Sequence, residues 1–406
     1  MTPKVVLAYS GGLDTSVCIR WLKESGYRVI AFCADVGQGE DLEPVRRRAL
    51  ELGAERAVVR NLQRVFAEEY VLPALKAGAV YEGKYLLATA LSRPLIARAL
   101  AEVARAQRAQ AVAHGCTGKG NDQVRIEVSL RILDPRLRIV APVREWRLRS
   151  REEEARYLRA RGLPVPKKTD SRYSIDQNLW GVSIESGPLE DPWVEPPADA
   201  FRWTADPRRA PAKPQVVKIE FQRGTPSRLN GRRMPLVQII QALNRIGARH
   251  GVGRSDLIED RLVGIKSREV YEAPAATVLH LAHRELEALT LDRETLAFKE
   301  AVAQRYARLI YDGLYFTPLK EALDRFVEST QENVTGTVRV KLFRGSALCA
   351  GRRSPHSRYA RSLATYGRGD LFDQRAAGGF ITLWGLPYTV RRTKGRLGTS
   401  YRLRSS

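Results

Sequence analysis

Cysteine and histidine are scarce in this sequence of 406 residues, which has four of the first and five of the second. The cysteines are scattered along the chain, at Cys18, Cys33, Cys116 and Cys349. Because no CxxC pair occurs, we expect neither a disulfide framework nor a zinc site, and we predict reduced thiols. His280 and His283 have a spacing that suits a metal on a helix, but no third ligand stands near them in the sequence.

Long apolar runs are absent as well. No stretch approaches about 18 consecutive apolar residues, and the first four residues lead directly into a strand-like run rather than a signal peptide. Hydrophobic residues make up 44% of the chain, which is a normal supply for a globular core. The sequence therefore predicts two or three domains in a cytoplasmic protein without a membrane partner.

Acidic residues are in deficit, because 45 Asp and Glu stand against 68 Lys and Arg, for a net charge of +23. Such an excess suits anionic ligands or nucleic acid, but it is also typical of solvated helix faces such as residues 45–52 and 98–108. We favour the solvated faces and expect no nucleic-acid partner. The basic run at residues 391–396 is the segment best suited to a polyanion.

Strand-like and helical patterns alternate over residues 1–165. The strand-like runs are residues 4–9, 28–34, 111–114 and 139–143. Helical patterns include residues 43–52 and residues 152–161, and the second is preceded by a capping box of Ser150 and Glu153. This alternation predicts an α/β fold in which a doubly wound parallel sheet forms a nucleotide-binding domain.

Nine prolines between residues 164 and 214 indicate a long irregular connection. Beyond it we expect a second, α+β domain over residues 170–365. Its predicted helices are residues 236–246, 276–289, 293–311 and 318–330, and its predicted strands are residues 216–221, 334–343 and 347–350. From Leu371 onward the chain is interpreted as polar, basic and Gly-rich, which is typical either of a C-terminal arm, over residues 366–406, that reaches a neighbouring subunit or of a partly disordered segment.

The strongest local signal is a small-residue loop that follows the first strand and opens the first helix. Its residues are Ala8, Tyr9, Ser10, Gly11, Gly12, Leu13, Asp14, Thr15 and Ser16. The two glycines allow a tight turn that exposes N–H groups, and a helix N-terminus carries partial positive charge. The hydroxyls of Ser10, Thr15 and Ser16 add further donors. We therefore expect a polyphosphate to bind here.

This loop has neither the Gly-Lys-Ser/Thr ending of a Walker loop nor the spacing of a dinucleotide fingerprint. It resembles the Ser-Gly-Gly-x-Asp-Ser/Thr-Ser pyrophosphate loop of enzymes that split ATP between its α and β phosphates. The resemblance implies adenylation with release of pyrophosphate. Ala34, at the end of the second predicted strand, is expected to line the adenine pocket, because ligands of open parallel sheets bind beyond the strand C-termini.

A second signature occupies residues 114–125, His-Gly-Cys-Thr-Gly-Lys-Gly-Asn-Asp-Gln-Val-Arg. A Gly-rich loop leads into a helix, and Asn121 and Arg125 share one face of it because they are four residues apart. An amino-acid substrate needs donors for its carboxylate and an acceptor for its ammonium. Thr117, Asn121 and Arg125 can supply the donors and Asp122 the acceptor. The alternative is a surface turn followed by an ion-paired helix.

These two segments resemble the argininosuccinate synthase family, and matching segments in the same order and spacing extend from residue 5 to about residue 355. The further segments are residues 81–85, 173–176, 182–185, 189–193, 259–264, 266–272 and 289–294. The resemblance implies an ATP-dependent, AMP-forming ligase of arginine biosynthesis, with Mg²⁺, that joins citrulline and aspartate through a citrullyl-adenylate. It also implies a cytoplasmic homotetramer in which residues 170–365 form the synthetase domain.

The resemblance further implies a role for each matching residue. ATP is expected to contact the loop at residues 8–16, Ala34 and Gly115. Aspartate is expected at Thr117, Asn121 and Asp122. The expected citrulline contacts are Tyr85, Ala90, Asn121, Arg125, Ser174, Ser183, Glu259 and Tyr271. Asp14, Asp122 and Arg125 are the expected catalytic residues, and the Mg²⁺ ligands stay open, with Asp14 and Asp122 as candidates.

The chain departs from the family pattern near the expected citrulline contacts. Ala90 stands where Ser is usual, and Glu269 stands where Gly is usual. The usual Thr and Gly-Gly are replaced by Ala273, Ala275 and Ala276. Ala90 removes a hydroxyl contact, and an unpaired Glu269 would repel a ligand carboxylate unless it points to solvent or pairs with a neighbour such as Arg268. A diverged or inactive paralogue that binds nucleotide or nucleic acid is therefore one alternative.

Two other classes of enzyme share the pyrophosphate loop. A tRNA-modifying enzyme would use the basic surface, but sulfur transfer generally needs paired cysteines, and Cys116 and Cys349 are not recognisably paired in the sequence. An amidotransferase-type synthetase would need a glutaminase domain, for which we find no segment. Pyrophosphate release that depends on both citrulline and ATP separates these alternatives.

Overall fold

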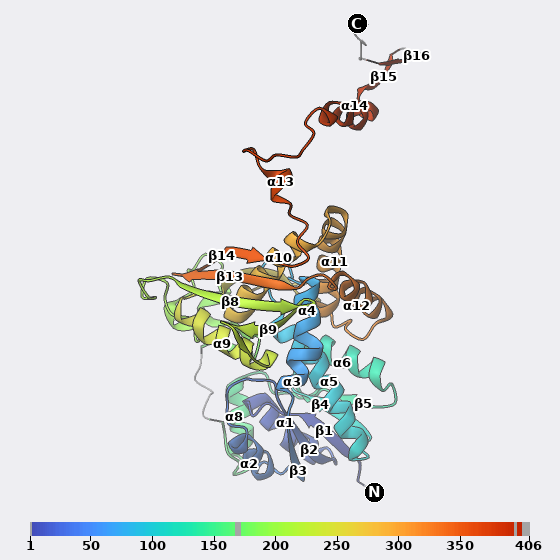
Figure 1. The fold of residues 1–406 in the computed structure, drawn as a ribbon. Helices are drawn as coiled ribbons and strands as arrows, with labels where there is room; N and C mark the ends of the chain where they lie inside the picture. The colour runs from blue at the N-terminus through green and yellow to red at the C-terminus, as the bar shows by residue number, and fades with distance from the viewer. Residues whose placement is uncertain (1, 167–171, 394–395, 400–406) are drawn as a thin grey trace. The chain divides into compact units, whose positions relative to one another are not determined.

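The computed structural model describes residues 2–166, 172–393 and 396–399, and the chain forms two compact units, Met1–His356 and Ser357–Ser406 (Figure 1). The first unit contains three sheets and most of the helices. The predicted domain limits at residues 165 and 365 remain predictions, and the limit at residue 170 lies outside the described residues.

The N-terminal part of the first unit is a five-stranded parallel sheet with the order β3-β2-β1-β4-β5. Its strands are β1 (Lys4–Ala8), β2 (Arg28–Asp35), β3 (Arg56–Asn61), β4 (Ala111–His114) and β5 (Arg138–Val140). The order reverses beside β1, where Ala8 pairs with Phe32 of β2 on one side and with His114 of β4 on the other. Such a reversal opens a crevice beyond the strand C-termini, which is where ligands of open α/β sheets bind.

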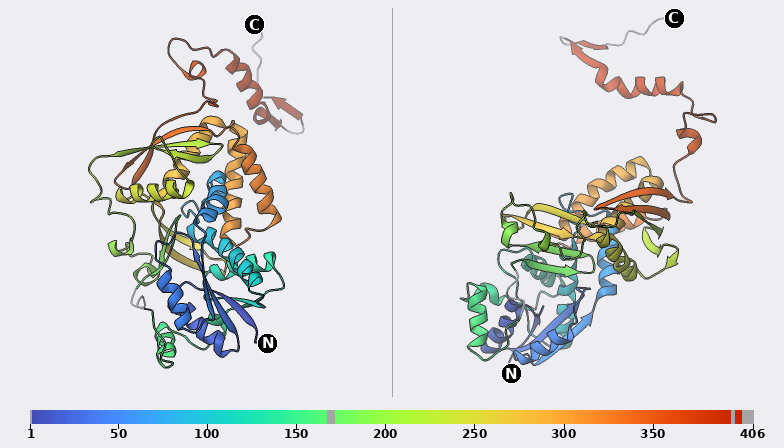
Figure 2. Two further views of the ribbon diagram at one scale, coloured as in Figure 1. Left: turned by 60° about the horizontal axis from the view of Figure 1, so that its bottom comes forward. Right: turned by 90° about the vertical axis from the view of Figure 1, so that its left-hand side faces the viewer.

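Helices cover both faces of this sheet, which confirms the doubly wound fold (Figures 1 and 2). Val5 and Leu7 pack in a core with α1, α2 and α8, whereas Val6 packs in a core with α5 and α6. These helices are α1 (Leu13–Glu24), α2 (Glu43–Glu51), α5 (Ala88–Ala106), α6 (Asp122–Leu133) and α8 (Arg151–Arg159). Because both faces are buried, the inner strands β1, β2 and β4 are apolar almost throughout, whereas the edge strands β3 and β5 are less buried and carry arginines. At the start of α8, the Ser150 hydroxyl accepts from the Glu153 N–H at 3.3 Å, as the capping box predicts.

Residues 62–95 leave the parallel sheet and join a second, larger core. This segment contains α3 (Gln63–Val65), the π-helix η1 (Phe66–Val71) and α4 (Leu72–Ala77). The helix α5 then lies in both cores. Leu91 and Leu95 of its first half pack in the larger core, and Leu100 of its second half packs against the parallel sheet.

The larger core lies beneath an antiparallel sheet with the order β10-β9-β8-β13-β14. Its strands are β8 (Gln215–Gln222), β9 (Thr225–Leu229), β10 (Arg232–Arg233), β13 (Gly336–Phe343) and β14 (Ser346–Arg353). The accompanying helices are α9 (Leu236–Arg249), α10 (Pro274–Thr290), α11 (Arg293–Tyr311) and α12 (Pro318–Thr330). All four helices and the strands β8, β13 and β14 were predicted, with ends that differ by a few residues. Val217, Ile219 and Phe221 alternate inward along β8, the pattern of a strand with one buried face.

A third sheet, with the antiparallel order β11-β12-β7-β6, was not predicted. Its strands are β6 (Ser174–Asn178), β7 (Gly181–Glu185), β11 (Arg254–Asp260) and β12 (Lys266–Glu272). One face carries Val182, Ile184 and Val270, which pack in a small core of their own. Ser183 and Tyr271 point to the opposite face, because side chains alternate along a strand. The remaining short elements of this unit are α7 (Pro142–Glu145), η3 (Gly187–Glu190) and η4 (Ala198–Ala200).

The second unit corrects the interpretation of the C-terminal segment as uniformly polar. It contains α13 (Arg361–Ala364), α14 (Ala376–Thr389), β15 (Val390–Thr393) and β16 (Arg396–Thr399). The helix α14 is apolar, and Phe380, Ile381, Leu383 and Trp384 are 61–71% exposed. The glycines of the segment that was interpreted as Gly-rich include three that lie within this helix, and Pro387 lies within it as well. Of the basic run at residues 391–396, Lys394 and Gly395 lie outside the described residues.

Across the described ranges, no helix combines the length and the apolar character needed to cross a membrane.

Candidate active site

The pyrophosphate loop lies at the C-terminal end of β1 and leads into α1, at the crevice that the fold predicts. Gly11 has φ +79°, which is a left-handed conformation, and an added Cβ would lie 2.9 Å from a methyl of Val45. The Ser16 hydroxyl donates to the Gly12 carbonyl at 2.7 Å, and the Ser10 and Thr15 hydroxyls lie 3.1 Å apart. No side chain caps α1, so its first N–H groups are available to an anion.

The loop that follows β4 meets the start of α1. A Cβ on Gly115 would lie 2.7 Å from the Thr15 side chain, so a glycine is needed for this close approach. His114, at the end of β4, is buried and lies 3.0 Å from a carboxylate oxygen of Glu127. Ala34, near the end of β2, is partly buried against the cores on the same side of the sheet as Val6. The residues expected to contact ATP therefore lie at the ends of three adjacent strands.

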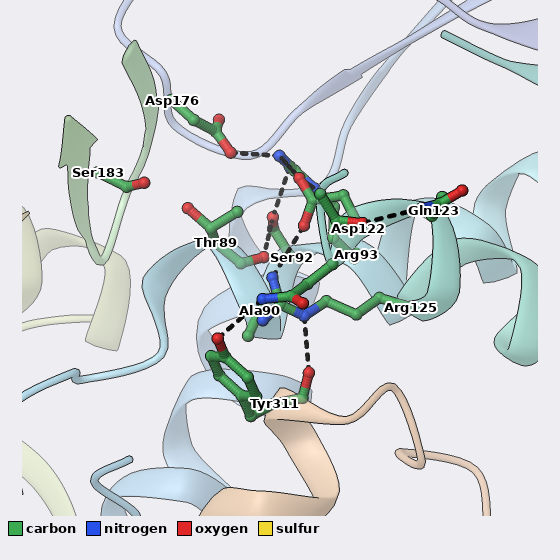
Figure 3. A network of polar contacts seen from close by, with 12 residues as sticks. Thr89, Ala90, Ser92, Arg93, Asp122, Gln123, Arg125, Asp176, Ser183 and Tyr311 are labelled. Carbon is green, nitrogen blue, oxygen red and sulfur yellow. Dashed lines mark hydrogen bonds and ion pairs between the residues drawn. The ribbon is translucent and has the colours of Figure 1, made fainter. Parts of the chain in front are cut away.

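Asp122, at the start of α6, is bound by two guanidinium groups (Figure 3). Arg93 Nε donates to it at 2.8 Å, and Arg125 Nη1 donates to it at 2.9 Å. Arg93 also forms an ion pair with Asp176 of β6 and a 3.1 Å bond to the Ser92 hydroxyl. Burial alone would raise the pKa of Asp122, but the two arginines outweigh burial and lower it. Asp122 is thus an ionised carboxylate in a buried network.

Arg125 is itself buried and held from several sides. Its Nε donates to the Tyr311 carbonyl at 2.9 Å, and its guanidinium lies 4.7 Å from the centre of the Tyr311 ring. The Asn121 amide donates to the Tyr311 hydroxyl at 2.8 Å and accepts from the Leu262 N–H at 2.9 Å. The shared face of Asn121 and Arg125 that the sequence predicted therefore exists, and Tyr311 packs on it.

A stack of tyrosines forms the next part of the site. Tyr85 stacks on Tyr271 with ring centres 4.3 Å apart, and its hydroxyl accepts from the Ala90 N–H at 3.1 Å. Tyr81 stacks on Tyr311 at 3.6 Å. Ala90 is fully buried in the larger core. The position at which this chain has Ala where the family usually has Ser is therefore a packed position of α5.

The polar face of the β11-β12-β7-β6 sheet completes the group. Tyr271 of β12 pairs in register with Ser183 of β7, and its hydroxyl lies 2.9 Å from Glu259 Oε2. Glu269, which the sequence left either unpaired or paired with Arg268, contacts Ser183, Tyr271 and Arg261 instead. Arg268 forms an ion pair with Asp256 at 2.6 Å. Of the cases that the sequence left open, the structure shows pairing with a nearby arginine, but the partner is Arg261 instead of Arg268, because Glu269 and Arg268 leave β12 on opposite faces.

The structure thus connects most of the predicted amino-acid contacts through hydrogen bonds or ring contacts. The connected residues are Tyr85, Ala90, Asn121, Asp122, Arg125, Ser183, Glu259 and Tyr271. Ser174 lies on the adjacent edge strand, where it pairs with Glu185. Thr117 lies in an exposed turn, and only its backbone bonds within the described residues, to the Gly120 N–H.

Four charged residues of this group had been given no role. Arg93, Asp176, Glu185 and Arg261 bridge the elements of the site. Asp176, Glu185 and Arg261 occur in segments that match the family pattern. Membership in those segments was the sequence feature that could have identified them as site residues. Arg93 is on α5, whose first half was not predicted, and an arginine within a run of alanine and leucine was the only sign of its burial.

The described residues contain no cluster of three or more His, Cys, Asp or Glu side chains that could hold a metal. His283 of the noted histidine pair bonds to Gln331 at 2.8 Å. All four cysteines are free thiols, and burial raises the pKa of Cys116 to about 12. Neither thiol chemistry nor zinc binding is therefore favoured by the side chains around the site.

Two family models match the chain. The one described as Arginosuccinate synthase N-terminal HUP domain matches residues 4–164, and the one described as Arginosuccinate synthase C-terminal domain matches residues 173–391. Curated relatives named Argininosuccinate synthase match nearly the whole chain. The relative from Pelotomaculum thermopropionicum is 57% identical over 389 residues, which cover 96% of this chain and 97% of the relative.

Two further relatives of the same name are equally similar. The protein from Rubrobacter xylanophilus is 58% identical over 384 residues, covering 95% of this chain and 94% of the relative. The protein from Geobacillus thermodenitrificans is 58% identical over 388 residues, covering 96% and 95%.

Proposed function

This chain belongs to the argininosuccinate synthase family, and from that premise we propose that it joins citrulline and aspartate to form argininosuccinate, with conversion of ATP to AMP and pyrophosphate. The observation that carries the proposal is the meeting of two loops at the crevice of the parallel sheet. The pyrophosphate loop follows β1, and the loop that opens α6 follows β4, with Gly115 against Thr15. A nucleotide and an amino acid bound to these loops would be neighbours.

The first step is adenylation of the ureido group. The ureido oxygen of citrulline attacks the α-phosphorus of ATP, and the bond to the bridging oxygen of pyrophosphate breaks. The N–H groups at the start of α1 and the turn at Gly11 and Gly12 suit the departing pyrophosphate, because they present partial positive charge without a side chain in the way. Ala34 and Gly115 would flank the nucleotide at the ends of β2 and β4.

The second step is attack by the aspartate amine on the ureido carbon, with AMP as the leaving group. We assign aspartate to Thr117, Asn121 and Asp122. We assign citrulline to the group formed by Tyr85, Asn121, Arg125, Ser174, Ser183, Glu259 and Tyr271. Ala90 of α5 belongs to this group through its backbone N–H, which donates to the Tyr85 hydroxyl. These residues position the reactants rather than react with them, since no step needs a nucleophilic side chain.

Mg²⁺ is expected to accompany ATP. Asp122 suits a metal poorly, because both of its oxygens are already bound by Arg93 and Arg125. Asp14, in the first turn of α1, suits it better because it stands within the pyrophosphate loop. The metal would neutralise phosphate charge and would be held mainly by phosphate oxygens, with Asp14 as the protein ligand we propose.

We also propose that the protein is a homotetramer whose C-terminal arm binds another subunit. The exposed apolar side chains of α14 support this, because a helix with four large apolar residues more than 60% exposed gains stability by burying them. The cytoplasmic location remains a prediction, as does the absence of a nucleic-acid partner.

The test is pyrophosphate release by the purified full-length protein. We expect release to require ATP and citrulline together, and argininosuccinate to form when aspartate is added, as detected by mass spectrometry. Release that needs tRNA or ammonia in place of citrulline would support the other pyrophosphate-loop enzymes. ATP binding without any release would support the inactive paralogue.

A further inference from the structure

Arg48 of α2 contacts the pyrophosphate loop from a helix that has so far been given no role in the site. Its Nη1 donates to the Gly11 carbonyl at 3.1 Å. Val45 lies three residues earlier, on the same face of α2, and one of its methyls lies 2.9 Å from the position that a Cβ on Gly11 would take. Because Val45 is buried in the core that α2 shares with α1, this face of α2 is fixed in place. The helix therefore holds Gly11 at two points.

The Arg48 guanidinium has no acidic partner. Within the described part of the chain it forms no ion pair, and the bond to Gly11 is the one hydrogen bond that its side chain makes. Arg46 of the same helix differs, because it pairs with Glu43 at 2.7 Å. Arg48 is half-buried, and a charge that is partly removed from water is normally paired. A bound polyphosphate would supply the missing anion.

The bond to the Gly11 carbonyl also determines where the Gly12 N–H points. The peptide bond between the two glycines is trans, so its C=O and its N–H point in opposite directions. With the carbonyl directed at Arg48, the N–H is directed away from α2. It donates to Ser10 Oγ at 3.3 Å, which is longer than the usual value of about 2.9 to 3.0 Å. Since Gly12 is exposed, this weakly bound N–H is available to a phosphate oxygen.

A peptide between two glycines is the part of the loop that can turn over most easily. Neither Gly11 nor Gly12 has a Cβ that would restrict the rotation. After such a rotation the Gly11 carbonyl would face the ligand, and a carbonyl oxygen repels phosphate. The hydrogen bond from Arg48 opposes the rotation, because the rotation would break a charge-assisted contact.

The loop itself has no cation to offer to a polyphosphate. Asp14 is its one charged residue among residues 8–16, and the start of α1 contributes only about half a positive charge. Any positively charged side chain must therefore come from outside the loop. The charge of Arg48 acts within the loop, since burial raises the pKa of Tyr9 and Arg48 is among the groups that oppose this rise.

We propose, on the basis of the function proposed above, that Arg48 is a positioning residue for the pyrophosphate end of ATP. It acts through the peptide between Gly11 and Gly12, whose N–H it directs at the β and γ phosphates. Its unpaired charge offsets the negative charge of the departing pyrophosphate. AMP has neither of these two phosphates, so the binding of AMP depends on Arg48 much less.

The test is calorimetric binding of inorganic pyrophosphate and of AMP to the full-length protein with Mg²⁺ present. Arg48→Met keeps the apolar stem but removes the donor and the charge. We expect its affinity for pyrophosphate to fall about tenfold, as for the loss of one charge-assisted hydrogen bond, and its affinity for AMP to change less than about twofold. Arg48→Lys keeps a charge and a donor and should restore most of the affinity for pyrophosphate. Arg48→Gln is shorter and uncharged, so it provides a second variant with the result expected for Arg48→Met.

Arg47→Met is the matched control, because Arg47 is the exposed neighbour of Arg48 on α2 and its loss removes the same charge. Both affinities should be unchanged in this control. The proposal is overturned if Arg48→Met and Arg48→Gln bind pyrophosphate as the wild type does, or if their affinities for pyrophosphate and AMP fall by the same factor. An equal loss of pyrophosphate affinity in Arg47→Met would also overturn it, since the effect would then be one of surface charge.

These binding measurements separate the inference from the proposed function, because they need neither citrulline nor turnover. If the wild type released no pyrophosphate from ATP, the proposed function would fail and binding would still decide the role of Arg48. If the wild type is active, Arg48→Met should raise the KM for ATP more than the KM for citrulline. An active protein in which the preference for pyrophosphate over AMP does not depend on Arg48 would refute the inference alone.

Discussion

Gly11 and Gly12 stand side by side in the pyrophosphate loop but differ in what a side chain would meet. Gly11 is buried, has a left-handed conformation and faces Val45 at 2.9 Å. Gly12 is exposed and has an extended conformation, and its added Cβ would lie an ordinary 3.4 Å from the Ser10 hydroxyl. The first glycine is needed for folding of the turn, whereas the second leaves room for a ligand.

We therefore expect Gly12→Ala to lose pyrophosphate release almost completely while it retains the wild-type unfolding temperature. The methyl group would lie at the start of α1, where the phosphates are proposed to bind. Gly11→Ala should lose both activity and stability, by about 1 kcal/mol or more for the strained conformation alone. Thermal unfolding followed by circular dichroism separates the two variants. Normal turnover by Gly12→Ala would contradict the assignment of the pyrophosphate loop.

Arg125→Ala should raise the concentration of citrulline needed for half-maximal rate much more than that of ATP. The guanidinium lies among the amino-acid contacts, and a charge-assisted hydrogen bond is worth about 1.5 to 3 kcal/mol, or roughly tenfold to a hundredfold in affinity. Some loss of stability should accompany it, because the half-buried Asp122 loses one of its two guanidinium partners and keeps only Arg93.

Steady-state kinetics with each substrate varied in turn measures this effect. Arg131→Ala is the control, since Arg131 is on the same helix and its side chain is 72% exposed. A change confined to the ATP requirement would show that Arg125 belongs to the nucleotide side of the site.

At the scale of elements, α1 and α8 pack together with an acid on each contacting face. Glu154 of α8 is buried, and its Oε2 has no hydrogen-bond partner among the described residues. Burial, followed by the nearby Asp14, raises the pKa of Glu154 to about 8. The folded chain therefore retains a proton that the unfolded chain loses near pH 4.5.

Because the pKa of Glu154 is higher in the folded protein than in the unfolded chain, we predict that Glu154 makes the protein less stable as the pH rises. Below pH 4.5 both states are protonated at this group and there is no effect; between 4.5 and about 8 the folded state binds more protons, so stability falls. Glu154→Gln removes the effect. The stability gained by the variant over the wild type should grow on the order of 2 to 4 kcal/mol between pH 4 and pH 9.

Urea unfolding of both proteins across this pH range measures the difference, and other titrating groups cancel in the comparison. Glu153→Gln, one residue away and half-buried on α8, should show no such growth. A constant difference at all pH values would show that Glu154 is ionised in the folded protein.

The predicted and missed elements differ in a physical way. The helices α11 and α12 were predicted to the residue because they are amphipathic and begin with clear start signals, Asp292 and Pro318. The first half of α5 was missed because a helix buried on all sides has no apolar stripe. The strands β6, β11 and β12 were missed because most of their residues are polar, and β7 was missed because Val182 and Ile184 alternate over a strand of only five residues.

Which segments belong to the site could be predicted from the sequence, but which side chains contact one another there could not. The pyrophosphate loop and the start of α6 could be found because each is a continuous segment. The surroundings of Glu269 could not, since they depend on the pairing of β7 with β12, strands about 85 residues apart. Contacts made across such distances follow from the register of a sheet, which local patterns do not determine.

At the scale of the whole molecule, α14 carries apolar side chains that the second unit does not bury by itself. A chain that ends at Asp370 lacks α14, and we expect it to form smaller species than the full-length protein in sedimentation velocity. Phe380→Asp with Trp384→Asp should do the same without shortening the chain. An intact tetramer in either variant would refute the proposed role of the arm.

The placement of α5 in two cores affects how this protein is made. When Leu95 leaves the ribosome, the larger core that will bury it still lacks β8, β13 and their helices, and β13 is complete only at Phe343. At a synthesis rate of about 5 to 20 residues per second, this interval lasts roughly 10 to 50 seconds. During that time the apolar side chains of residues 66–95 lack part of the core that will bury them, so the nascent chain exposes apolar surface and is prone to aggregation until β13 has emerged.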